Sequence, residues 1–196
     1  MNHQETIINY ARKLVSLTDD EGLQFAAAFK EYRVKKRQFI IQPDFTAKSR
    51  YFVLEGSLRA YVIGDEGQEH TIQLAIEEWW ISDYNSYIFQ QPANMFVVAM
   101  EDGLLFQLTH EQESRLKAEN HKFETFFRIL AERSVAFMQR RIISSLTQSA
   151  EERYELFVEK YPAMVSRFPQ YVIASYLGMT TEFLSKIRNQ RVKPKS

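Results

Sequence analysis

The clearest chemical pattern in this sequence lies near its C-terminal end, between Thr180 and Asn189. Three apolar residues stand at helical spacing among polar ones there, in the segment Thr-Thr-Glu-Phe-Leu-Ser-Lys-Ile-Arg-Asn. At about 100° per residue on a helix, Phe183, Leu184 and Ile187 fall in one arc and the polar residues in the other. Lysine and arginine can donate to guanine, asparagine pairs with adenine, and glutamate accepts from cytosine. The segment therefore predicts a helix whose polar face reads bases in the major groove.

The segment just before it, Phe168 to Gly178, predicts a first helix and a turn. Pro169 fits the first helical position, where its missing N–H is not needed, and Gly178 fits the position just past the helix end. Ala174 is small where two helices would cross closely. The apolar face of this helix consists of Val172, Ile173, Tyr176 and Leu177. Together the two segments predict a helix-turn-helix.

The spacing alone fits an ordinary helical hairpin with a solvated second helix equally well. The charge distribution favours DNA binding. The chain has 25 basic and 25 acidic residues, yet the part from Lys186 onward contains no acidic residue. Its basic residues are Lys186, Arg188, Arg191, Lys193 and Lys195. Positive charge is therefore concentrated beside the motif, where DNA phosphates would lie.

The predicted DNA-binding residues are Thr180, Thr181, Glu182, Ser185, Lys186, Arg188, Asn189, Arg191 and Lys193. Within this set, Thr181, Glu182 and Lys186 are expected to read bases, joined by Ser185 and Asn189. Arg191, Lys193 and Lys195 are expected to contact phosphates, which adds affinity without sequence information.

The composition excludes several classes of chemistry. The chain contains no cysteine, which excludes disulfides, thiolate nucleophiles and cysteine-held iron–sulfur or zinc sites. The histidines, His3, His70, His110 and His121, lack metal-binding spacing, so we expect no metal site. No histidine or nucleophile accompanies the pair Glu77 and Glu78, so we expect no enzyme. Without a signal segment or an apolar run of about eighteen residues, we expect a cytoplasmic protein with no membrane partner.

The elements that must position the motif begin with two helices and a β-domain. The first helix is predicted from Glu5 to Leu17, and Thr18 to Glu21 form a capping box for the second. Short β-rich segments separated by turn signals then predict an antiparallel barrel or sandwich. These segments are Tyr32–Arg37, Gln38–Gln42, Ser49–Leu54, Ser57–Ile63, His70–Ile76, Met95–Met100 and Leu104–Leu108.

A long helix is predicted from Lys122 to Thr147, and a capping box at Ser149 to Glu152 starts another that ends near Lys160. The apolar residues of the long helix cover more than one stripe, so we expect it to pack on the barrel and on a second subunit. The alternative is a core helix in a compact monomer.

This order of elements resembles the Crp/Fnr superfamily of bacterial transcription regulators, in particular a short subgroup common in Bacteroidetes-type bacteria. The segment Phe52–Arg59, followed by Gly64–Glu69, resembles that family's barrel signature, and Thr181–Lys186 resembles its recognition helix. The resemblance implies an α+β chain with a jelly-roll, cyclic-nucleotide-binding-like barrel at 1–121, a dimerisation helix at 122–147 and a DNA-binding unit at 148–196. It also implies a homodimer, a near-palindromic double-stranded operator and contact with RNA polymerase.

The sequence departs from the family pattern in the segment where cyclic AMP would bind. Relatives that bind it use an arginine for the cyclic phosphate, but no arginine lies between Arg59 and Arg115 in this chain. A buried phosphodiester needs a cationic partner or oriented N–H groups, so we expect no cyclic nucleotide as cofactor. The chain also ends eighteen residues beyond Gly178, too early for the β-hairpin wing of many relatives. This implies either a minimal DNA-binding unit or a truncated chain.

Aromatic residues cluster where the ligand cassette should lie. They define a predicted pocket for an unidentified small-molecule effector, composed of Trp79, Trp80, Ser82, Asp83, Tyr84, Tyr87 and Asn94. The alternative, which we favour, is that these rings fill the barrel mouth in place of a ligand. A second alternative concerns the whole chain, which would be a sensing or interaction module whose helix-turn-helix is only a structural cap.

Overall fold

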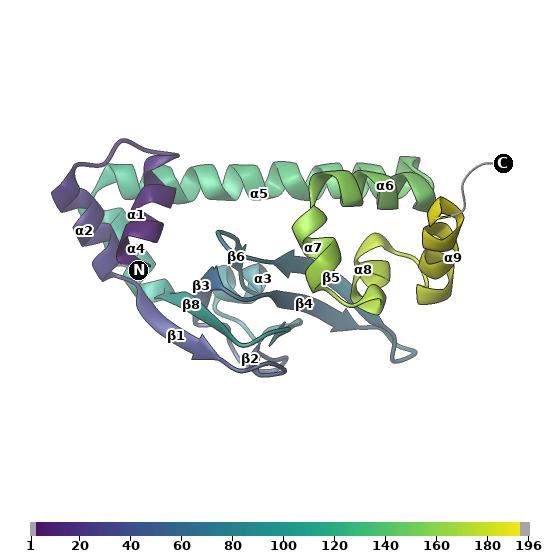
Figure 1. Ribbon diagram of the computed structural model, residues 1–196. Coiled ribbons are helices and arrows are strands. Elements are labelled where there is room, and N and C mark those ends of the chain that lie inside the picture. Colours follow the sequence, from purple (N-terminus) through teal and green to yellow (C-terminus); the bar gives the residue numbers. More distant parts are fainter. Residues whose placement is uncertain (1–2, 193–196) are drawn as a thin grey trace.

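The computed structural model describes residues 3–192 and shows a β-domain flanked by helices, with one long helix running along the molecule (Figure 1). Helices α1 (His3–Arg12) and α2 (Asp19–Ala27) come first. The strands are β1 (Lys30–Val34), β2 (Phe39–Ile41), β3 (Ser49–Glu55), β4 (Leu58–Ile63), β5 (Glu69–Ala75), β6 (Trp80–Ile81), β7 (Phe96–Ala99) and β8 (Gly103–Thr109). The other helices are α3 (Tyr84–Phe89), α4 (His110–Glu119), α5 (His121–Thr147), α6 (Ala150–Lys160), α7 (Pro162–Arg167), α8 (Gln170–Leu177) and α9 (Thr181–Val192).

The strands form two four-stranded antiparallel sheets, in the orders β1-β8-β3-β6 and β2-β7-β4-β5. The inner faces of both sheets supply one apolar cluster, which includes Val53, Leu58, Val97 and Leu105. This arrangement confirms the predicted fold class of an antiparallel barrel with flanking helices. Most β-rich segments of the sequence became strands because every second residue can point into this core, while in β3 and β8 the residues between them are buried under helices on the outer face.

A second cluster attaches the helices to the outer face of the first sheet. Phe52 and Phe106 of that sheet pack with Phe25 of α2 and with Phe123 and Phe126 at the start of α5, and all five are buried. The ring centroids of Phe25 and Phe126 lie 4.9 Å apart in an edge-to-face arrangement. Aromatic pairs of this geometry stabilise a core beyond the area they bury.

Local signals predicted some boundaries better than others. The capping boxes at Thr18 and Ser149 are both present, with side-chain and backbone hydrogen bonds in both directions. The first helix, however, ends at Arg12 and not at Leu17, and Pro169 is the N-cap of α8 and not its first helical residue. Local sequence signals did not predict α3, β6 or α7. These elements are short and are stabilised mainly by contacts with the elements packed against them.

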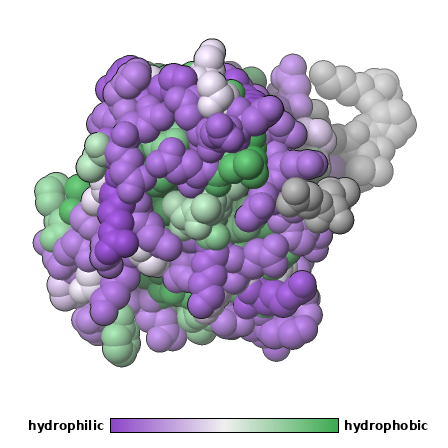
Figure 2. Space-filling view, turned by 90° about the vertical axis from the view of Figure 1, so that its left-hand side faces the viewer, coloured by the Kyte–Doolittle hydropathy of each residue, from purple (hydrophilic) through white to green (hydrophobic). Residues whose placement is uncertain are grey.

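Helix α5 changes character along its length. Its first turns are buried in the aromatic cluster, but its second half exposes large apolar side chains, with Val135 59%, Ile142 58% and Leu146 79% exposed. By contrast, the end of the molecule formed by α1, α2 and α4 is mostly hydrophilic, with a small apolar area near its centre (Figure 2). The second half of α5 is therefore an unpartnered apolar face.

The aromatic cluster predicts a large stability effect at Phe126. Phe126→Ala should lower the free energy of unfolding by about 3–5 kcal/mol, because it leaves a cavity between α5, α1 and α2. Urea denaturation followed by circular dichroism measures this. Phe89→Ala serves as the control, since Phe89 is 70% exposed and should change stability little. Equal effects of the two substitutions would contradict this account of the core.

Candidate DNA-binding site and its coupling to the barrel

Helices α8 and α9 form the predicted helix-turn-helix. Helix α8 ends at Gly178, whose φ of 68° lies in the left-handed region that favours glycine. The Met179 amide donates to the Ala174 carbonyl at 3.0 Å, which closes the turn as in a Schellman motif. Thr180 then caps α9, since its Oγ1 accepts from the Phe183 amide at 3.2 Å. Turn and cap together set the angle between the two helices.

The apolar side of the motif is packed as predicted, with one exception. Ala174 is buried where α8 meets α9, and Leu184 and Ile187 of α9 are buried in the same cluster. Phe183 was predicted to join them, but it is 42% exposed. It lies one residue before Leu184, about 100° around the helix from that buried position.

The polar side of α9 is open to solvent. Glu182, Lys186 and Asn189 are exposed at a spacing that places them on one face of the helix, and Thr180 is also exposed. Thr181, Ser185 and Arg188 are partly exposed beside this face. We call the residues Glu182, Lys186 and Asn189 the exposed face of α9. Lys193 and Lys195 and the side chain of Arg191 lie outside the described residues, so the predicted phosphate contacts stay predictions.

The helix-turn-helix is hydrogen-bonded to the barrel through Ser175 of α8. Its Oγ accepts from the Thr71 amide at 2.8 Å and donates to the Glu69 carbonyl at 2.7 Å, both on β5. Next to these bonds, Leu74 of β5 is buried in the same apolar cluster as Ile173 and Leu184. Strand β5 is therefore part of the core around the helix-turn-helix as well as of the barrel sheet.

Arg167, at the end of α7, forms a second connection. Its guanidinium pairs with Glu77 at 2.5 Å and with Glu101 at 2.6 Å, in two separate loops of the β-domain. Partial burial raises the pKa of the Glu77 carboxyl, but hydrogen bonds from Arg167 and from the Gly56 amide outweigh this effect, so the pKa is lowered overall. Glu77 is thus held ionised as part of an interdomain ion pair.

The predicted effector residues do not form a common pocket. Trp79 packs on Phe137 of α5 and Tyr161, toward the DNA-binding unit. Trp80, the next residue, packs in the opposite direction, on Phe52 and Phe126. Two cavities stand out in the described part of the chain, and none of the seven predicted residues lines either of them.

The polar members of that set are used for local structure. Asp83 caps α3 by accepting from the Ser86 amide, and its other oxygen accepts from the amides of Asn94 and Met95. Ser82 donates to the Ser49 carbonyl. The Asn94 side chain and Tyr84 are at the surface. The geometry agrees with the alternative in which these residues complete the barrel.

A buried cationic cluster beside α3 was missed in the sequence analysis. The Arg50 guanidinium pairs with Glu113 of α4 at 3.1 Å and stacks on the Trp80 ring at 4.5 Å. Burial raises the pKa of Glu113, but the charges of Arg50 and Lys117 outweigh it and lower the pKa. Tyr87 donates to the same carboxylate at 2.8 Å, and burial followed by the Glu113 charge raises its pKa. Arg50 precedes the stretch searched for a phosphate ligand, and its charge is already neutralised.

Within residues 3–192, no group of three or more histidine, aspartate or glutamate residues is arranged to hold a metal ion. None of the helices in that range is both long enough and apolar enough to cross a bilayer.

Comparison with known proteins links this architecture to a family. The cyclic nucleotide-binding domain family matches residues 31–120. The structure of FixK2 from Bradyrhizobium japonicum aligns with a TM-score of 0.72 at 16% identity, over 83% of both chains. A candidate transcriptional regulator of the Crp/Fnr family from Eubacterium rectale aligns with a TM-score of 0.67 at 18% identity, over 90% of this chain and 84% of that one.

The catabolite activator protein of Thermus thermophilus aligns with a TM-score of 0.57 at 17% identity, over 92% of this chain and 85% of that one. A comparison with curated protein sequences found no match. The chain has the Crp/Fnr fold. Residues 31–120 match the cyclic nucleotide-binding domain family, so the domain and the fold agree with the resemblance seen in the sequence. In this chain the helix-turn-helix is held against β5, which lies within the matched residues.

The ion pair of Arg167 predicts a pH-dependent contribution to stability. The pKa of Glu77 is lowered from its ordinary value of 4.5, so its contacts stabilise the folded state above that pH and are lost as the pH falls through the folded-state pKa. Glu77→Gln should therefore lower the free energy of unfolding at pH 7 by about 1 kcal/mol or less, because the pair is partly exposed.

Urea denaturation between pH 7 and pH 3 measures this, and the difference from the wild type should shrink below about pH 4.5. Glu66→Gln is the matched control, since Glu66 lies exposed in the turn between β4 and β5. A difference for Glu77→Gln that stays constant with pH would contradict this assignment.

Proposed function

We propose that this Crp/Fnr-type chain is a sequence-specific DNA-binding transcription regulator. The observation that carries the proposal is the exposed face of α9, where Glu182, Lys186 and Asn189 point away from a fully packed helix pair. These side chains have the donors and acceptors that read base edges in the major groove. The remaining predicted residues, Thr181, Ser185 and Arg188, flank this face and suit contacts to bases or to phosphates.

The proposal includes a homodimer through α5. A large exposed apolar face on a single helix is rare on a monomer, and the second half of α5 carries Val135, Met138, Ile142, Ile143 and Leu146. Pairing of two such helices would bury these residues and relate the two DNA-binding units by a two-fold axis. The expected operator is near-palindromic, with half-sites about one helical turn, or about 34 Å, apart. Contact with RNA polymerase belongs to the same proposal.

We further propose that this regulator does not respond to cyclic AMP. The only buried arginine close to α3 is Arg50 among the described residues, and its charge is balanced by Glu113 and covered by Trp80. A cyclic phosphate would have to displace the buried Glu113 carboxylate from Arg50 and would leave it with Lys117 as its only cationic partner among the described residues, and breaking a buried ion pair is costly. The same proposal assigns residues 1–121 to the sensor domain, 122–147 to the dimerisation helix and 148–196 to the DNA-binding unit. Its function is not enzymatic, and its place is in the cytoplasm with the DNA.

The competing function is a sensing or interaction module whose helix-turn-helix only caps the structure. Ser175 and Arg167 attach the motif firmly to the barrel, which this alternative would also require. It does not explain why α9 presents several exposed hydrogen-bonding side chains on one face and buries only the opposite one. DNA binding is therefore the better-supported function.

The DNA-reading proposal is tested by binding selection from random duplex oligonucleotides, followed by affinity measurement on the selected sequence. Lys186→Ala and Glu182→Ala should each weaken binding by about 1–3 kcal/mol and relax the preference at the contacted base pair. Lys36→Ala removes an exposed lysine from the barrel and should leave both unchanged. If neither variant of α9 changes affinity or preference, the chain does not read DNA through this helix.

The dimer is tested by light scattering after size-exclusion chromatography. The wild type should have twice the mass of one 23.2 kDa chain, whereas the double variant Val135→Glu with Leu146→Glu should be monomeric. Each glutamate would otherwise be buried in an apolar interface without a partner. Leu23→Glu, at an exposed leucine of α2, is the control and should remain dimeric. A monomeric wild type would refute pairing through α5.

A further inference from the structure

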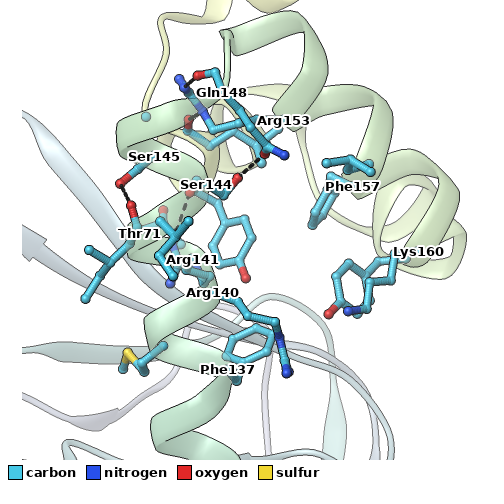
Figure 3. Close-up of a pocket in the computed structure, with 18 of the residues that line it drawn as sticks. Thr71, Phe137, Arg140, Arg141, Ser144, Ser145, Gln148, Arg153, Phe157 and Lys160 are labelled. Carbon is cyan, nitrogen blue, oxygen red and sulfur yellow. Dashed lines mark hydrogen bonds between the residues drawn. The ribbon is translucent and has the colours of Figure 1, made fainter.

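A cavity of about 980 Å³ lies where α5, α6, α8 and β5 meet, away from the cassette that the family resemblance points to. Its volume is at the upper end of the range of small-molecule sites, which is about 300–1,000 Å³. Figure 3 shows Phe137, Arg140 and Arg141 on α5, with Phe157 and Lys160 of α6 across the space from them. Leu156 and Tyr161 add to the apolar part of the lining. Met138, Ile142 and Ile143 of α5 line the cavity too and belong to the face that the proposed dimer would cover, so a ligand there would lie at the border of that interface.

The cavity also carries positive charge that no carboxylate balances. Arg141 donates to the carbonyls of Ile72 and Tyr176, and Arg153 donates to those of Leu177 at 3.0 Å and Gln148 at 2.7 Å. These carbonyls accept hydrogen bonds but have no formal charge. Neither guanidinium is in an ion pair within the described part of the chain, although both are partly buried. Charged groups that are buried in a protein are normally paired with a group of opposite charge.

Arg140 differs from these two because it is exposed and has no hydrogen bond or ion pair with a described residue. Its guanidinium lies beside Phe137 at the edge of the cavity (Figure 3). Lys160 adds another cation to the lining, and Glu159 is its only acidic residue. An apolar space with one free guanidinium group at its edge and two guanidinium groups without a carboxylate partner in its lining is suited to a ligand with an apolar body and one anionic end.

We propose that this cavity binds a small amphipathic anion, namely an aliphatic or aromatic carboxylate or sulfonate. Its apolar body would lie between Phe137 and Phe157, and its anionic group would accept from Arg140. Such a ligand would contact the long helix, the DNA-binding unit and β5 at once. It would thereby stabilise their relative position, independently of the barrel cassette.

The binding test uses the full chain and decanoate as the probe, measured by isothermal titration calorimetry. Decanoate should bind with one saturable site per chain, and 1-decanol, which has the same body without the charge, should bind at least about tenfold more weakly. Arg140→Gln should weaken decanoate binding about tenfold. Arg133→Gln is the matched control, because Arg133 lies two turns earlier on the same side of α5, outside the cavity, and it should bind as the wild type does.

A second variant locates the site. Ser144→Phe places a ring in the cavity from α5 and should abolish decanoate binding, with folding checked by circular dichroism. If Ser144→Phe does not fold, the comparison of Arg140→Gln with Arg133→Gln still shows whether decanoate binds at this cavity. Absence of decanoate binding, as expected if a second copy of the chain fills the cavity, would overturn the proposal. Equal binding by the wild type and Arg140→Gln would also overturn it. Neither result depends on DNA binding.

Discussion

The packing of aromatic rings between α5 and the outer face of the first sheet is the interaction on which the rest of the molecule depends. Phe123, Phe126 and Phe127 fix the start of α5 against Phe52 and Trp80. Because an α-helix is stiff, fixing its first turns also sets the direction of its remaining turns. The rest of α5 then extends over the barrel to α6 and so sets where the C-terminal helices lie (Figure 1).

The two halves of helix α5 have different apolar sides. Its first half is apolar toward the barrel, and its second half is apolar on a side that faces solvent in a single chain. Hydrophobic burial alone would not leave Val135, Ile142 and Leu146 in water, at a cost of about 25 cal/mol for each Å² of exposed apolar surface. The position of these residues makes a second copy of the chain the simplest partner, because pairing equivalent faces needs no other complementary protein.

The barrel and the C-terminal helices are joined by a few polar contacts. Ser175 bonds to main-chain groups of β5, and Arg167 joins two loops of the β-domain. Around these bonds the two parts share the buried side chain of Leu74. A small shift of β5 would therefore be transmitted directly to α8 and, through the shared cluster that contains Leu184, to α9.

The sequence by itself determined the elements whose signals are local. Capping boxes at Thr18 and Ser149, the turn at Gly178 and the alternation within the strands depend on residues within a few positions of one another, and the structure has each of them. The polar face of α9 followed from helical periodicity in the same way. Periodicity did not predict the exposure of Phe183, because exposure depends on how α9 packs on the rest of the chain.

Only the tertiary structure decided which residues meet across long separations. Arg50 and Glu113 are 63 positions apart, and Ser175 and Thr71 are 104 apart, so no local pattern could pair them. The same holds for Trp79 and Trp80. Their aromatic side chains predicted a shared pocket, but the side chains of successive residues point in opposite directions, so the two rings pack in different clusters. Residue type and spacing determine what a segment can form, whereas the burial of charges and rings is settled by contacts that exist only once the chain has folded.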